Sequence, residues 1–276
     1  IFMGMTESPV LIKNYLPTMN RSEIFLVMVS GMGTIAGSVM GTYIGMLGGT
    51  DPAAKVLFAT HLLSASVMAV PGSIVLAKML CPQTEEATDH VAISGKEKEN
   101  SNILDAISSG TVTGVKLMTN IAAMLLVFIS LVALANYITE GVIGRYTGLN
   151  DWIVKITDGK AQGLTFQFIL GVITSPFMWL IGVPSQDIML VGSLLGQKTI
   201  LNEFVAYFQL QQWKDAGLFM YEKSILMSTY ILCGFANISS IGILLGGLGV
   251  LAPEKRGLIS RIGVPAMIGG ALVSVL

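Results

Sequence analysis

The hydrophobic residues of this chain gather in long stretches that contain no charged residue. Measured between flanking charges, the long stretches lie at 24–50, 56–77, 117–139, 161–186 and 224–253, with a shorter one at 262–276. About 20 helical residues cross the ~30 Å hydrocarbon core of a bilayer, so most of these stretches are long enough to cross it once. None shows the strict alternation of a barrel strand. The pattern therefore predicts an all-α polytopic membrane protein built from transmembrane helices.

Two further apolar stretches, 188–197 and 204–213, are too short to cross a membrane. They flank the polar segment 198–203. Irregular backbone at membrane depth is tolerated only inside protein or beside water, so this arrangement predicts a re-entrant helical hairpin with 198–203 at its tip. The opening residues 4–12 have the pattern of the second half of another such hairpin, in which Pro9 fits the start of the outgoing helix.

Polar segments separate these stretches and divide the chain into parts. We predict loops at 83–101 and 140–160, and the positive-inside rule favours a cytoplasmic location for the basic loop 251–261. Asp187 is expected to cap the helix that follows it. The predicted parts are a half hairpin with two transmembrane helices (1–80, transport domain), a polar loop with a connecting helix (81–116), a scaffold helix with a loop (117–160), and the second hairpin region with the last transmembrane helices (161–276, transport domain).

The composition narrows the class of protein further. Charged residues make up 12% of the 276 residues and hydrophobic residues 53%, whereas a typical soluble domain carries about 25% charge. The net charge of −1 provides no basic face for nucleic acid. These values argue against a soluble enzyme, a nucleic-acid binder and a disordered protein. Two cysteines are too few for a disulfide framework.

Small and polar residues recur at the centres of two long stretches, at 30–39 and at 233–242. Each centre follows a predicted hairpin tip that carries a glutamate, Glu7 in the first case and Glu203 in the second. Paired interrupted segments in two halves are the sequence pattern of a secondary-transporter site. A helix that unwinds at such a centre frees carbonyl groups for a cation, and intramembrane carboxylates accept strongly from the hydroxyls of a neutral polyhydroxylated solute.

Three ordered motifs resemble the concentrative nucleoside transporter family. They are GMTESPVLIK at 4–13, NEFVAY at 202–207 and CGFANISSI at 233–241, and the similarity extends over essentially the whole chain, including IAGSV at 35–39 and GGL at 246–248. The resemblance implies a homotrimer in which each protomer has a trimerising scaffold and a moving transport domain with two re-entrant hairpins.

The resemblance also implies roles for individual residues. Thr6 and Glu7 would hold the nucleobase, with Val39 packed against it. The ribose hydroxyls would be bound by Glu203, Asn237 and Ser240, with Phe235 close by. The family's sodium ligands match the Thr34 side chain and the carbonyls of Met3 and Ile35.

One departure from the family concerns the base. Met5 stands where the family usually has glutamine, and a methionine cannot donate a hydrogen bond to a base edge. Met5 therefore leaves the choice between purine and pyrimidine open. Glu7 could carry a proton in place of a sodium ion, and the Thr34 hydroxyl could bond to its own helix instead of an ion.

These features predict ion-coupled nucleoside import by an elevator-like secondary transporter, with sodium or a proton as the coupling ion and no other cofactor. We expect a multi-pass protein of the cytoplasmic membrane, and the chain to be a fragment of it. A membrane assembly or receptor protein that binds a polar solute without transport is the alternative. A membrane enzyme is less favoured, because the zinc-protease pattern HExxH is absent from a sequence with two histidines.

Overall fold

The computed structural model describes residues 3–85, 133–157, 159 and 161–276, together with isolated positions between 102 and 131. All regular structure in these residues is helical, as the hydrophobic pattern predicts. The chain divides into two compact units, one formed by Ile1–Ala92 with Gln167–Leu276 and the other by Ile93–Phe166. The predicted loop 83–101 falls outside the described residues except for its first positions, 83–85.

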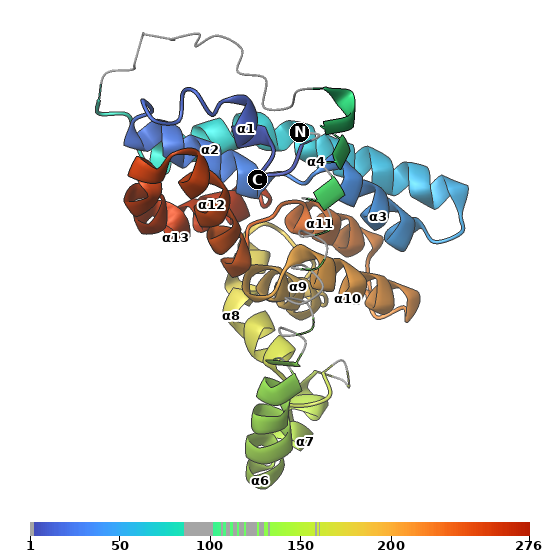
Figure 1. Cartoon of the computed structure of the whole chain (residues 1–276). Helices are drawn as coiled ribbons and strands as arrows, with labels where there is room; N and C mark the ends of the chain where they lie inside the picture. Colours follow the sequence, from blue (N-terminus) through green and yellow to red (C-terminus); the bar gives the residue numbers. More distant parts are fainter. Residues whose placement is uncertain are drawn as a thin grey trace. The chain divides into compact units, whose positions relative to one another are not determined.

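The N-terminal part of the first unit contains one short helix and three longer helices, coloured in blues in Figure 1. They are α1 (Ser8–Leu11), α2 (Arg21–Gly33), α3 (Gly37–Gly48) and α4 (Pro52–Leu80). A capping box starts α2: the Asn20 side chain accepts from the Glu23 amide, and the Glu23 side chain accepts from the Asn20 amide. The predicted stretch 24–50 is therefore two half-helices, α2 and α3, with a break at 34–36.

The C-terminal part of this unit contains α8 (Phe166–Leu180), α9 (Ile188–Ile200), α10 (Glu203–Asp215), α11 (Glu222–Leu232), α12 (Ile238–Leu251), the 3-10 turn η2 (Pro253–Lys255) and α13 (Arg256–Val273). The predicted stretch 224–253 is also broken, between α11 and α12, at 233–237. Unwinding at both small-residue centres is thus confirmed. The predicted loop 251–261 is shorter than expected, because α13 begins at Arg256.

The helices α9 and α10 form the second predicted hairpin and pack against each other. Only Leu201 and Asn202 lie between them, so the pair of short helices is confirmed and its tip is shorter than predicted. Lys198 and Thr199 belong to the last turn of α9, where the Thr199 hydroxyl donates to the carbonyl of Leu195 at 2.8 Å.

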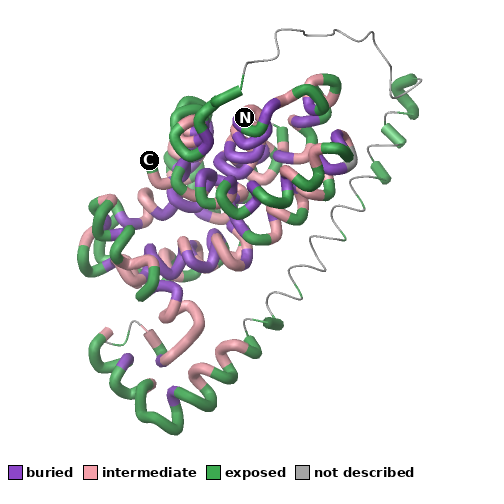
Figure 2. The backbone as a smooth tube through the Cα atoms, turned by 90° about the vertical axis from the view of Figure 1, so that its left-hand side faces the viewer, coloured by how far each residue is buried: buried purple, intermediate pink, exposed green. Residues whose placement is uncertain are grey.

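Buried residues, purple in Figure 2, recur along the helices of the first unit. Their side chains form two large hydrophobic clusters. The first cluster joins α2 to α13 and includes Met28, Met32 and Ile262. Contact there is close, because a Cβ placed on Gly270 would lie 2.7 Å from the Cβ of Met32. The second cluster joins α3, α4, α10 and α11. Each break therefore lies between helices that are anchored on both sides.

Three helical segments of the described residues are long and apolar enough to cross a membrane. They are Arg21–Gly48 with 28 residues, which includes the break between α2 and α3, Pro52–Leu80 with 29 and Pro253–Val273 with 21. Shorter apolar helices accompany them at Phe166–Leu180, Ile188–Ile200 and Ile238–Gly249. Large apolar side chains such as Val67 and Met68 of α4 are exposed, which suits a surface in contact with lipid.

The second unit contains a π-helical stretch, η1 (Tyr137–Gly144), followed by α6 (Arg145–Thr147) and α7 (Leu149–Ile156). The prediction of a loop at 140–160 is therefore wrong for most of that segment. Gly148 adopts the left-handed conformation, with φ +72°, and this lets the chain turn between α6 and α7. Most of the predicted scaffold stretch 117–139 lies outside the described residues.

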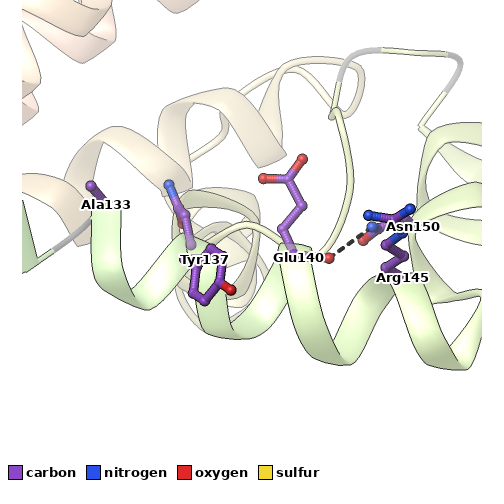
Figure 3. A pocket seen from close by; sticks show the side chains of 7 residues that line it. Ala133, Tyr137, Glu140, Arg145 and Asn150 are labelled. Carbon is purple, nitrogen blue, oxygen red and sulfur yellow. Dashed lines mark hydrogen bonds between the residues drawn. The ribbon is translucent and has the colours of Figure 1, made fainter.

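Asn150 ties this unit together beside a polar pocket (Figure 3). Its Nδ2 donates to the carbonyl of Glu140 at 3.0 Å, and its Oδ1 accepts from the amide of Leu164 at 3.0 Å. The pocket has a volume of about 350 Å³. None of the residues with a predicted functional role lines it; its lining residues are Ala133, Asn136, Tyr137, Glu140, Gly141, Arg145 and Asn150.

The prediction that Asp187 caps the helix after it is wrong. Its fully buried carboxylate makes no capping bond to α9 and instead accepts from the amides of Met220 at 3.0 Å and Tyr221 at 3.1 Å. These amides lie at the start of α11, where Tyr221 provides no side-chain cap. A buried carboxylate needs hydrogen-bond donors, and these two backbone N–H groups provide them for Asp187.

Candidate functional site

Glu203 is the first residue of α10 and lies at the tip of the second hairpin. Asn202 precedes it as the N-cap residue, with its side chain accepting from the amide of Val205 at 2.9 Å. Only 7% of Glu203 is exposed. Its Oε2 accepts a hydrogen bond from Nδ2 of Asn237 at 2.9 Å. The tip of the hairpin thus directs a carboxylate at the break between α11 and α12.

Asn237 is the N-cap residue of α12 and is buried. Its Oδ1 accepts from the amide of Ser240 at 2.9 Å, from the Ser240 hydroxyl at 2.9 Å and from the Ser239 hydroxyl at 2.6 Å. Because these three donors fix the side-chain oxygen of Asn237 toward α12, its NH₂ group points to Glu203 and donates to it. The structure therefore brings together three of the predicted residues, Glu203, Asn237 and Ser240.

Tyr43 is a further member of this group, and no sequence motif indicated it. Its hydroxyl, from α3, donates to Oε1 of Glu203 at 3.4 Å. The Tyr43 ring stacks on Tyr207 of α10 with the centroids 4.0 Å apart and an interplanar angle of 21°. Tyr207 in turn donates to the carbonyl of Thr229 at 2.8 Å. In the sequence, the one feature that pointed to Tyr43 was its hydroxyl group, a polar group within an apolar stretch.

The two breaks meet at Gly234. Its φ of +142° favours glycine, and a Cβ at this position would lie 2.9 Å from the carbonyl oxygen of Met32 and 3.1 Å from that of Gly33. Backbone therefore packs on backbone where the end of α2 passes the segment between α11 and α12. This close approach places the segment 34–36 beside the segment 233–237.

The first predicted hairpin contributes in a different way. Met5 is 8% exposed and packs in the first core cluster, where a Cβ on Gly31 would lie 3.1 Å from the Met5 Cβ. Thr6 is half-buried, and its Cγ2 would lie 3.5 Å from a Cβ on Gly247 of α12. Glu7 is exposed. Among the described residues, no hydrogen bond links the segment around Glu7 to the segment around Glu203. The structure therefore does not join the two glutamates directly.

Val39 and Phe235 supply apolar surface around the breaks. Val39, in the first turn of α3, is partly buried against the second core cluster. Phe235, between α11 and α12, is partly buried and packs against both clusters. Phe235 lies within one break and Val39 three residues after the other, so both can cover an apolar face of a ligand bound there.

Thr34, Ile35 and Met3 are the residues predicted to bind an ion. Thr34 is the C-cap residue of α2, and its hydroxyl donates to the carbonyl of Ser30 at 2.9 Å. Because the hydroxyl proton is used in this bond, the lone pairs of Oγ1 remain available to a cation. Ile35 is fully buried in the break, whereas Met3 is 43% exposed. A hydroxyl and carbonyl oxygens form the donor set that hard cations prefer.

Two helix N-termini therefore meet around one buried carboxylate. Glu203 stands at the start of α10, and its partner Asn237 caps the start of α12. The positive ends of these helices stabilise negative charge, and a carboxylate held in this way accepts strongly from hydroxyl groups. The arrangement is suited to binding a neutral solute rich in hydroxyls.

Comparison with known proteins places the chain in a family. Residues 61–276 match the model of the Na⁺-dependent nucleoside transporter C-terminus. The chain is 38% identical over 279 residues to an uncharacterized transporter of Haemophilus influenzae, covering 100% of this chain and 62% of that protein. It is 39% identical over 290 residues to sodium/nucleoside cotransporter 1 of Rattus norvegicus, covering 100% of this chain and 41% of that protein.

Solved structures agree with these relatives. The chain matches CNTnw in an inward-facing substrate-bound state with a TM-score of 0.82 and 36% identity, over 99% of this chain and 60% of CNTnw. A substituted CNTnw in an outward-facing state matches with a TM-score of 0.84 and 35% identity, over 99% of this chain and 61% of that protein. The chain thus spans about two fifths to three fifths of the length of these proteins. It belongs to the family of Na⁺-dependent nucleoside transporters, and its fold is that of an all-α polytopic membrane protein.

Proposed function

We propose that the full-length protein imports nucleosides across the cytoplasmic membrane in symport with an ion. The observation that carries this proposal is the buried network of Glu203, Asn237 and Ser240 between two half-helices, in a chain whose family is one of sodium-dependent nucleoside transporters. The family is one of transporters, which argues against a membrane enzyme.

In this proposal the ribose is bound at the second hairpin. The ribose hydroxyls are bound by Glu203, Asn237 and Ser240. The NH₂ group of Asn237 donates to the Glu203 carboxylate, and the Ser240 hydroxyl donates to the Asn237 amide oxygen. Thr6 and Glu7 bind the nucleobase from the first hairpin, with Met5 behind them and with Val39 and Phe235 covering its apolar faces. Met5 lies in the core, so it would influence base choice through shape and through the hydrogen bond that it cannot make.

The coupling ion in this proposal is sodium, bound at the broken end of α2. Its ligands would be the Thr34 hydroxyl oxygen and the carbonyls of Met3 and Ile35. The names of the relatives support sodium, and the oxygen donors at this break suit it. Ion binding would order the first hairpin, so the affinities for sodium and nucleoside would be reciprocally linked. A homotrimer with a scaffold and an elevator-like transport domain completes the proposal.

Uptake into proteoliposomes that contain the full-length protein tests this function. Radiolabelled uridine and inosine would be offered with and without an inward sodium gradient at fixed pH. Sodium-dependent accumulation is expected, and the ratio of the two nucleosides would report on Met5. Accumulation that follows a pH gradient and ignores sodium would assign the coupling to protons. Nucleoside binding without accumulation would favour the receptor alternative and contradict the proposal.

A further inference from the structure

Lys198 is a fully buried lysine in the last turn of α9. Burying an ammonium group away from water is expensive unless its donors are satisfied. Its Nζ donates to the carbonyl of Ile231 at 2.8 Å and to the hydroxyl of Ser274 at 2.9 Å. Both acceptors are neutral oxygens, so the side chain brings a positive charge from α9 to the last turn of α11 and to the residue that follows α13.

The acceptor at Ile231 belongs to the broken end of α11. The last carbonyls of a helix have no partner within the helix and form its negative end. Here the carbonyl of Tyr230 accepts from the Cys233 amide at 2.9 Å, that of Thr229 from the Tyr207 hydroxyl, and that of Ile231 from Lys198. Two side chains of the second hairpin, one from α9 and one from α10, therefore complete the end of α11.

The broken end of α2 is completed differently. Its carbonyl at Ser30 accepts from the hydroxyl of Thr34, a neutral group of the same chain segment. This is the end at which the proposed function places the coupling ion. The ends of α2 and α11 lie beside one another where Gly234 contacts the carbonyls of Met32 and Gly33. Their partners differ: a carbonyl at the end of α2 accepts from a neutral hydroxyl, and one at the end of α11 accepts from an ammonium group.

We propose that the ammonium group of Lys198 has the same role at the end of α11 as the coupling ion has at the end of α2. It binds the negative end of the half-helix and fixes the second hairpin against it. Glu203 follows five residues later in the same hairpin, so Lys198 positions the carboxylate that receives the ribose. This inference rests on the proposed function and deepens it, because it gives a physical reason for placing the proposed ion at the end of α2 and not at the end of α11.

The first test replaces Lys198 with methionine, which has a similar length and no charge. Nucleoside binding to the purified full-length protein would be measured by calorimetry at saturating sodium. Lys198→Met is expected to weaken binding by about tenfold or more, since hydrogen bonds from a charged donor are about twice as strong as neutral ones. The matched control is Lys223→Met, an exposed lysine of α11 that donates to the carbonyl of Gly182 at 3.3 Å, and it should bind like the wild type. Unchanged affinity in Lys198→Met would overturn the inference.

A second test separates the charge from simple packing. Lys198→Ala leaves a space for a small organic cation, so ethylammonium chloride should restore most of its nucleoside affinity and raise its melting temperature, whereas choline chloride at equal concentration should do neither. A folded Lys198→Ala protein that ethylammonium does not rescue would contradict a cationic role. The melting temperature can be measured without nucleoside. If the wild-type protein binds no nucleoside, the proposed function fails, but the effect of ethylammonium on the melting temperature of Lys198→Ala still shows whether Lys198 acts as a cation.

Discussion

Replacing Glu203 with glutamine changes the charge of the candidate ribose site while preserving its shape. In the structure Oε2 accepts from Nδ2 of Asn237 at 2.9 Å and Oε1 accepts from the hydroxyl of Tyr43 at 3.4 Å. A glutamine can keep both contacts, because its oxygen can face Asn237 while its NH₂ group donates to the tyrosine oxygen, whose proton can rotate away. We therefore expect the folded protein to lose less than about 1 kcal/mol of stability, the usual net value of one neutral hydrogen bond.

The effect on ligand binding should be much larger. A hydrogen bond to a charged group contributes about 1.5–3 kcal/mol and a neutral one about 0.5–1.5 kcal/mol, so each ribose hydroxyl that donates to the residue at 203 would lose about 1–1.5 kcal/mol. Two such hydroxyls give a loss of about 2–3 kcal/mol, which corresponds to a roughly 30- to 150-fold weaker affinity.

Calorimetric titration of the full-length Glu203→Gln protein with uridine measures this loss, and a thermal melt measures stability. The same titration with 2′-deoxy- and 3′-deoxyuridine should show that the substitution reduces discrimination against the deoxy compounds. The exposed Glu222, at the start of α11, provides the matched control Glu222→Gln, which should bind like the wild type. Wild-type affinity and wild-type discrimination in a folded Glu203→Gln protein would refute the assignment of Glu203 to the ribose.

Three further substitutions test other contacts. Tyr43→Phe keeps the stack on Tyr207 and removes the hydroxyl that donates to Glu203, so nucleoside affinity measured by calorimetry should fall by about 2- to 12-fold, while the exposed Tyr221→Phe should have no effect. Gly234→Ala forces a Cβ to within 2.9 Å of the Met32 carbonyl at a φ of +142°, so it should destabilise the protein by about 2 kcal/mol or more. The control Gly242→Ala, in open space within α12, should be neutral or stabilising by up to about 1 kcal/mol. Equal melting temperatures for these two variants would contradict the close contact of backbone on backbone at Gly234. Asp187→Ala leaves the amides of Met220 and Tyr221 without their acceptor, and a melt should show a loss of about 2–5 kcal/mol; a melting temperature like that of the wild type would mean that water replaces the carboxylate.

The breaks in two long helices could be predicted because their cause is local. Small residues at 30–39 and at 233–242 give little side-chain packing to support a continuous helix, and Asn237 is a residue that favours a new helix start. The shortness of the stretches that became α9 and α10 is likewise a local property, which is why the hairpin was predicted correctly. The extent of its tip was not predicted correctly. The polar residues 198 and 199 look like part of a loop in the sequence, but they form the last turn of α9, where the Lys198 side chain is buried against α11.

The contacts that the sequence did not reveal depend on residues far apart in the chain. Tyr43 reaches Glu203 across 160 positions, and Lys198 reaches Ser274 across 76. Asp187 had two groups of N–H donors within its reach, those of its own helix and those before α11, and only the packing of α9 against α11 selects the second. The roles of Glu203, Asn237 and Ser240 toward ribose were implied by family resemblance and stay a proposal, although the structure places the three side chains in one network.

The contact of backbone on backbone at Gly234 has a mechanical consequence. No side chain lies at this point to act as a flexible spacer, since a Cβ there would meet the carbonyls of Met32 and Gly33. A displacement of the segment between α11 and α12 must therefore push directly on the end of α2. We therefore expect the two breaks to move together in any rearrangement of this unit, with the bending taken up in other segments of the chain.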